Sequence, residues 1–198
     1  MKSKSLRLLL FAFFLAGHCL EAQVNDCSGA GIICDDGPVT SNSQGPGTND
    51  FASANNDNGC LQAGEHQSSW YYFEFMPNMP VNSTIEFTIS PIGGSGEDFD
   101  FAIYGPFVGC DSLGTPLRCS YASPNCAFCP MTGLGNNAND TSEGAAGDGF
   151  LAPLTVQPGQ GFFLLVDNWL DSSNGFNLSW GGEAAGYLNC NANPYCAF

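Results

Sequence analysis

The chain has 198 residues, of which 19 are acidic and 4 are basic, so its formal net charge at neutral pH is −15. This balance excludes nucleic-acid binding, because no basic surface is available to neutralise phosphates. It also disfavours binding to an anionic membrane surface. The acidity fits a soluble exported protein, and it fits equally well a protein whose carboxylates hold divalent cations.

The first 22 residues have the pattern of a secretory signal peptide. Lys2, Lys4 and Arg7 precede an apolar stretch at residues 8–16 that is too short to span a membrane well. We expect cleavage after Ala22 and no membrane insertion of the mature chain. Its remaining one basic and 18 acidic residues give a formal charge of −17.

The mature chain is expected to form one β-sandwich domain over residues 23–182, followed by a cysteine-containing tail at 183–198. Residues 84–90 alternate apolar and polar side chains, which predicts a half-buried strand. The other expected strands are residues 31–34, 70–75, 99–103, 151–156, 161–166 and 175–180. Residues 105–149 read as a long Cys- and Gly-rich connection. Short strands without amphipathic helices predict an all-β, jelly-roll-like antiparallel β-sandwich with long loops.

Nine cysteines follow the signal peptide, which in an exported chain predicts a disulfide framework. The expected disulfide cysteines are Cys27, Cys34, Cys60, Cys110, Cys119, Cys126, Cys129 and Cys190. The CxxC at residues 126–129 is also compatible with zinc, but only one histidine follows the signal peptide, so disulfides are favoured. The odd cysteine and the end of the sequence at Phe198 favour a fragment of a longer protein.

Acidic residues follow a glycine-rich stretch at residues 93–96. The stretch begins like a calcium-binding nonapeptide, but Asp100 replaces the required apolar residue and no second copy occurs. Asp98 and Asp100 are two positions apart on an expected strand, so both leave the same face, with Cα atoms roughly 6.5 Å apart. Two such carboxylates repel unless a cation or water separates them. Other oxygen donors that suit Ca²⁺ are Asp167, Asn168, Asp171 and Glu65. The alternative is a solvated acidic face.

Three stretches together resemble a CUB-type module: EDFDFAIYGP, CDSLGTPLRC and LLVDNWLDSSNGFNLSW. The resemblance implies a Ca²⁺ site in which Asp100 is one ligand, Asp167 or Asp171 is a second, and Glu65 or Glu97 is the glutamate. This chain departs from the family in its inserted segment at residues 119–149, and in having Asp-Asn-Trp where the family has Ser-Asp.

The sequence also resembles N-terminal modules of secreted surface proteins of Bacteroidota. The shared stretches are GTNDFASANN, CLQAGEH, SSWYYFEF, TSEGAAGDGF and LLVDNW. The resemblance implies export and display at the cell surface.

We therefore expect a secreted or cell-surface β-sandwich that binds structural Ca²⁺ and serves adhesion or the recognition of a protein or glycan, without catalysis. Trp169 and Tyr104 are the expected ligand contacts. His66 is the only histidine available as a base, and neither HExxH nor GxSxG occurs. A glycosidase needs only two carboxylates. The alternatives are thus an accessory or hydrolytic module of a larger secreted enzyme, or a passive spacer.

Overall fold

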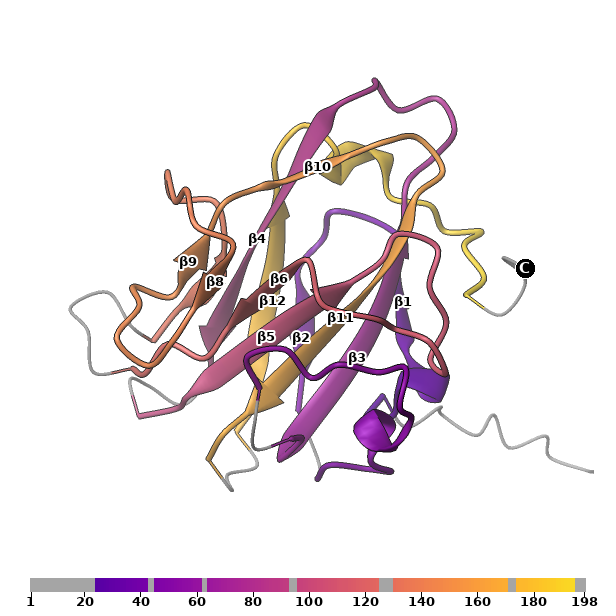
Figure 1. Ribbon diagram of the computed structural model, residues 1–198. Helices are drawn as coiled ribbons and strands as arrows, with labels where there is room; N and C mark the ends of the chain where they lie inside the picture. The colour runs from indigo at the N-terminus through magenta and orange to yellow at the C-terminus, as the bar shows by residue number, and fades with distance from the viewer. Residues whose placement is uncertain are drawn as a thin grey trace, which may run out of the picture.

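The computed structural model describes residues 24–42, 45–61, 64–92, 96–124, 130–170 and 174–194. Within these ranges the chain forms two six-stranded β-sheets that pack against each other as a sandwich (Figure 1). Three short 3₁₀ helices lie among the described residues: η1 (Cys27–Gly29), η2 (Asp50–Ala52) and η3 (Ala185–Tyr187). No helix in these ranges has the length and apolar character needed to cross a membrane.

The first sheet has the strand order β1-β3-β11-β5-β6-β8. Its strands are β1 (Gly31–Ile33), β3 (Gln67–Glu74), β11 (Gly161–Asn168), β5 (Phe99–Tyr104), β6 (Arg118–Ser120) and β8 (Ser142–Glu143). The central pairs are antiparallel, whereas β1 pairs with β3 and β6 with β8 in parallel. The expectation of a wholly antiparallel sheet is therefore wrong at the edges.

The second sheet has the order β2-β12-β4-β7-β9, with β10 also paired to β4. Its strands are β2 (Val39–Ser41), β12 (Phe176–Gly181), β4 (Ser83–Pro91), β7 (Thr132–Leu134), β9 (Phe150–Leu151) and β10 (Leu154–Val156). The single strand expected at residues 151–156 is two strands with different partners. Pro153 separates them, because proline has no N–H to donate to a ladder.

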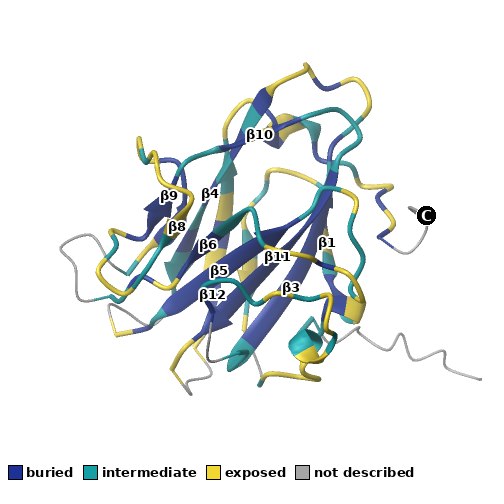
Figure 2. Ribbon diagram, viewed as in Figure 1, coloured by how far each residue is buried: buried dark blue, intermediate teal, exposed yellow. Residues whose placement is uncertain are grey.

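The main core lies between the two sheets and follows from the alternation of side chains along each strand. Ile85, Phe87 and Ile89 of β4 face Phe101 and other buried residues of the first sheet. In Figure 2 the central strands β3, β5 and β11 are almost entirely dark blue, so they are buried on both faces. From the sequence a cation site and a solvated acidic face were both possible on the outer side of β5, and the structure buries Asp100 and Tyr104 there.

A second apolar cluster covers that outer face. Trp70 and Tyr72 of β3, Phe163 and Leu165 of β11, and Ala102 and Tyr104 of β5 pack against residues from two loops. We call residues 50–61 and 108–113 the outer loop layer, because their apolar side chains (Phe51, Cys60, Leu61, Val108, Cys110 and Leu113) cover this face. The layer explains why these central strands are buried on both faces.

Three disulfides tie the loops and the C-terminal segment to the sandwich: Cys27–Cys110, Cys34–Cys190 and Cys60–Cys119. They confirm disulfide bonding for six of the eight expected cysteines, and they indicate an oxidising environment. Cys126 and Cys129 lie outside the described residues. The segment expected to be a polar tail also contributes to the main core, through Ala184, Ala185 and Leu188.

Candidate functional site

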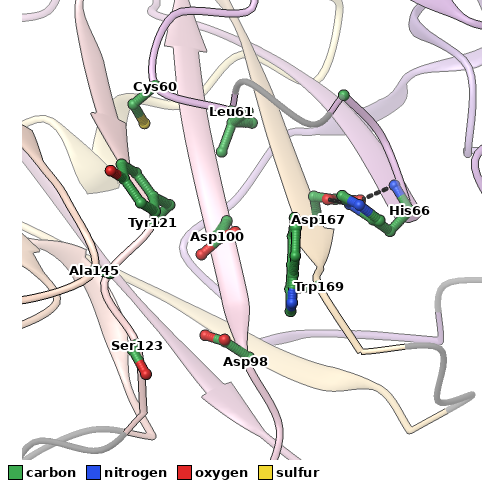
Figure 3. A pocket seen from close by; sticks show the side chains of 11 residues that line it. Cys60, Leu61, His66, Asp98, Asp100, Tyr121, Ser123, Ala145, Asp167 and Trp169 are labelled. Carbon is green, nitrogen blue, oxygen red and sulfur yellow. Dashed lines mark hydrogen bonds and ion pairs between the residues drawn. The ribbon is translucent and has the colours of Figure 1, made fainter.

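A pocket of about 330 Å³ opens on the outer face of the first sheet, beside the outer loop layer. Its lining includes Leu61 and Cys60 from that layer, His66 next to β3, and acidic side chains of β5 and β11. Figure 3 shows these side chains around the pocket, with Asp98 and Asp100 between Tyr121 and Trp169. The pocket lies where the loop layer ends and a polar part of the outer face begins.

Strand register creates this polar part of the face. Asp167 of β11 lies opposite Ser68 of β3 on one side and opposite Asp100 of β5 on the other. The next outward row along the same strands is Trp70, Leu165 and Ala102, which is entirely apolar. Because side chains in one row point to the same face, the three polar residues lie together at one end of an otherwise apolar surface.

Asp167 is buried, with 1% of its surface exposed, and its carboxylate is fully engaged. Its Oδ1 accepts hydrogen bonds from the backbone N–H of His66 (2.7 Å), the N–H of Gln67 (3.0 Å) and the hydroxyl of Ser68 (3.3 Å). Its Oδ2 lies 2.8 Å from Nδ1 of His66. A carboxylate has about four acceptor positions, so Asp167 has little capacity left for a ligand. It was expected in a loop, but β11 continues through it and Asn168.

Asp100, directly across from Asp167, is 5% exposed, and Asp98 is half-buried. Within the described parts of the chain, neither carboxylate receives a hydrogen bond or forms an ion pair. Burial, and to a lesser extent the negative charges of Asp98 and Asp167, together raise the pKa of Asp100 to about 8. Burial also raises the pKa of Asp98. The pocket therefore contains a buried acid that has no partner among the residues that the structure describes.

Trp169 forms one side of the pocket, and its position is fixed from two directions. Its backbone N–H donates to the carbonyl of Asp98 at 2.8 Å. Its ring lies against the imidazole of His66, with centroids 4.4 Å apart, and His66 is in turn held by Asp167. The Trp169 side chain nevertheless remains 48% exposed. Its role as a contact for a partner stays a prediction.

The other predicted metal ligands lie elsewhere. Glu97 is buried, accepting hydrogen bonds from the side-chain amides of Asn168 (2.9 Å) and Asn174 (2.6 Å). Asn168 uses its Oδ1 to accept from the N–H of Leu170. These residues form an amide–carboxylate network that holds the loop after β11. The predicted ligand Asp171 lies outside the described residues.

Glu65 belongs to a third group, next to the outer loop layer. Its Oε1 accepts from Nε1 of Trp70 at 2.8 Å, and its Oε2 accepts from the N–H of Asp50 at 3.0 Å. Burial raises the pKa of Glu65 to about 7, and the hydrogen bond from Trp70 opposes that shift. Glu65 therefore anchors the loop layer to β3. Tyr104, expected as an exposed contact, is fully buried at the end of β5 beneath the layer, so that expectation was wrong.

The six predicted calcium ligands that the structure describes thus do not gather into one set. In the described ranges, no three His, Cys, Asp or Glu side chains are placed to hold a metal ion together. The pair that remains available is Asp98 and Asp100, whose carboxylates supply up to four of the six to eight oxygens that Ca²⁺ takes. A calcium site at these two carboxylates therefore stays a prediction, and it would need further oxygens from water.

Sequence reasoning missed the side of the pocket opposite Trp169. Tyr121, Ser123 and Ala145 line it, and they come from the segment at residues 119–149 that was treated as an insertion of unknown role. Parallel pairing of β6 with β8 brings this segment beside β5. No sequence signal identified it, because β6 and β8 are three and two residues long. Comparisons of the chain with protein-family models, curated proteins and solved structures found no match.

Proposed function

We propose that this protein is a secreted or cell-surface recognition module, without catalytic activity, in which Asp98 and Asp100 bind Ca²⁺ at a pocket that receives a protein or glycan partner. The observation that carries the proposal is Asp100, a carboxylate that is 5% exposed, faces the pocket and has no hydrogen-bond donor among the described residues. Leaving a buried carboxylate uncompensated is costly. A cation bound in the pocket would remove that cost.

The neighbouring Asp167 supports a site at this position rather than anywhere else on the acidic surface. Its four hydrogen bonds hold the start of β3 and the end of β11 in fixed register beside β5. Asp100 is therefore displayed from a rigid sheet, and Asp98 lies directly before its strand β5, an arrangement that keeps ligands preorganised. Three disulfides and a strongly acidic composition are consistent with function outside the cell.

Thermal unfolding of residues 23–198 in excess Ca²⁺ and in chelator tests the calcium part. Extracellular sites bind Ca²⁺ with dissociation constants of roughly 10⁻⁴ to 10⁻³ M. At about 100 times that constant, binding should stabilise the fold by about 2.7 kcal/mol. We expect Asp98→Asn and Asp100→Asn each to remove most of the shift.

Asp36→Asn is the matched control, because Asp36 is exposed and does not line the pocket. It should respond to Ca²⁺ as the unsubstituted protein does. An identical melting curve in Ca²⁺ and chelator for the unsubstituted protein would refute the calcium site. Equal loss of the shift in Asp36→Asn would show that the response reflects overall negative charge instead of this pair.

A further inference from the structure

Two exposed aromatic side chains flank the carboxylates of the pocket. Trp169 follows β11 and Tyr121 follows β6, and these strands lie on either side of β5, which carries Asp100. Trp169 is 48% exposed and Tyr121 is 42% exposed, and both line the pocket. Two strand spacings separate their strands by about 10 Å. In Figure 3 Asp98 and Asp100 lie in the gap between the two rings.

Tyr121 is held in place by the segment that sequence reasoning treated as an insertion. Its N–H donates to the carbonyl of Glu143, and the N–H of Ser123 donates to the carbonyl of Ala145. A Cβ added to Gly144 would lie 3.1 Å from the Tyr121 hydroxyl oxygen. The ring therefore packs over the backbone of Gly144 at a place where a larger residue would crowd it.

The two aromatic rings and the carboxylates between them match the chemistry of a sugar. The C–H bonds on the flat face of a pyranose carry partial positive charge, which suits the negative face of an aromatic ring. Its hydroxyl groups donate hydrogen bonds, and carboxylates with free acceptor positions can receive them. A pocket of about 330 Å³ is at the small end of the range for small-molecule sites, so it suits one or two sugar residues.

Other ligand classes match this pocket less well. Anionic glycans and nucleotides match it less well, because the described residues bring no Lys or Arg to the pocket lining and the whole chain has a formal net charge of −15. A lysine ammonium is a compact point charge, so it would use the carboxylates without explaining two separate exposed rings. A neutral pyranose can stack on both aromatic rings and donate hydrogen bonds to the carboxylates.

We propose that the pocket binds a neutral glycan, with a sugar ring lying between Trp169 and Tyr121 above Asp98 and Asp100. This inference rests on the proposed function and specifies its partner. It assigns the segment at residues 119–149 a role, namely to supply Tyr121 as the second aromatic wall of the pocket.

Native-gel affinity electrophoresis of residues 23–198, with Ca²⁺ present, tests the proposal. The probes are soluble β-1,3-glucan, β-1,4-xylan and β-1,4-mannan, with alginate as an anionic control and a lysine-rich peptide as a competitor. We expect at least one neutral glycan, and not alginate, to retard the protein. Trp169→Ala and Tyr121→Ala should each weaken retardation at least tenfold, whereas Tyr121→Phe, which keeps the ring, should retain most of it.

Phe107→Ala is the matched control, because Phe107 is an exposed aromatic residue (58%) that does not line the pocket, and it should bind as the unsubstituted protein does. The proposal is overturned if no neutral glycan retards the protein. It is also overturned if Trp169→Ala and Tyr121→Ala bind glycan as strongly as the unsubstituted protein does. Displacement of a bound glycan by the lysine-rich peptide would indicate a cationic ligand and also overturn it. Release of reducing ends from a bound glycan would contradict the non-catalytic role.

Melting of the same proteins separates this proposal from the calcium site. Trp169→Ala and Tyr121→Ala should keep the Ca²⁺-dependent shift while losing glycan binding. A Ca²⁺ shift without glycan retardation would leave the calcium site standing and refute only the glycan. Glycan retardation without a Ca²⁺-dependent shift in melting would support the glycan site and refute the calcium site.

Discussion

Asp167 and Asp100 lie opposite each other on neighbouring strands, and both are almost fully buried, yet their surroundings differ completely. Asp167 accepts four hydrogen bonds from three consecutive residues at the start of β3. Asp100 receives none from the described residues, and its pKa is raised to about 8 by burial and by the charges of Asp98 and Asp167. A buried carboxylate with a complete set of donors is part of the framework. One that faces a pocket without donors is better explained by a ligand.

The largest expected effect is the loss of stability when Asp167, the carboxylate with a complete set of donors, is replaced. Asp167→Ala leaves two backbone N–H groups and the His66 side chain without their acceptor. Each buried donor left unsatisfied costs about 1–3 kcal/mol. We expect the free energy of unfolding to fall by about 3–5 kcal/mol, measured by denaturant unfolding in chelator. Asp98→Ala is the control and should change it by less than about 1 kcal/mol. Similar losses of unfolding free energy in Asp167→Ala and Asp98→Ala would show that Asp167 is no more a part of the framework than Asp98 is.

A smaller effect is expected from the covalent link between the loop layer and the sheet. The Cys60–Cys119 disulfide joins residues 59 positions apart, and Cys60 lines the pocket. Replacing both cysteines with alanine should cost about 2–4 kcal/mol and should also weaken the Ca²⁺ response, since the layer borders the site. The corresponding double variant at Cys34 and Cys190, which do not line the pocket, should lose stability with a normal Ca²⁺ response. Equal Ca²⁺ responses in the two double variants would show that the layer does not shape the pocket.

The smallest predicted change in stability concerns Asp100 and depends on pH. The unfolded chain ionises this group near its ordinary pKa of 3.8, whereas the folded protein ionises it near 8. Between these values the folded state holds more protons, so in chelator the stability contribution of Asp100 decreases as pH rises from about 4 to 8. Asp100→Asn should flatten that decrease and gain on the order of 2 kcal/mol at pH 8. This is well below the roughly 6 kcal/mol that the full shift gives at about 1.4 kcal/mol per pKa unit, because the pocket leaves the carboxylate accessible to water.

Stability curves measured across this pH range test the Asp100 prediction. Some decrease should persist in Asp100→Asn, because burial also raises the pKa of Glu65 to about 7. Calcium favours the ionised carboxylate, so the Ca²⁺ shift of the unsubstituted protein should be larger at pH 8 than at pH 5. A variant whose curve runs parallel to that of the unsubstituted protein would mean that Asp100 titrates normally and has an unrecognised partner.

The sequence by itself determined the secondary structure of the central strands and the class of fold. Alternation in β4 and the aromatic run in β3 require burial on at least one face, and nine cysteines without the signal peptide require a disulfide framework. It also predicted that Asp98 and Asp100 lie near each other, and both line the pocket, although β5 begins at Phe99 and Asp98 lies just outside the strand.

Only the tertiary structure decided which acids are available to a ligand. Glu65, Glu97 and Asp167 looked equivalent to Asp100 along the chain, but donors from distant segments occupy all three. The outer loop layer buries Tyr104, and the parallel pairing of β6 with β8 brings Tyr121 to the pocket. Pairing between segments distant in sequence depends on the packing of the whole sandwich. Local patterns report the faces of single strands, so they could not have revealed which residues meet across the pocket.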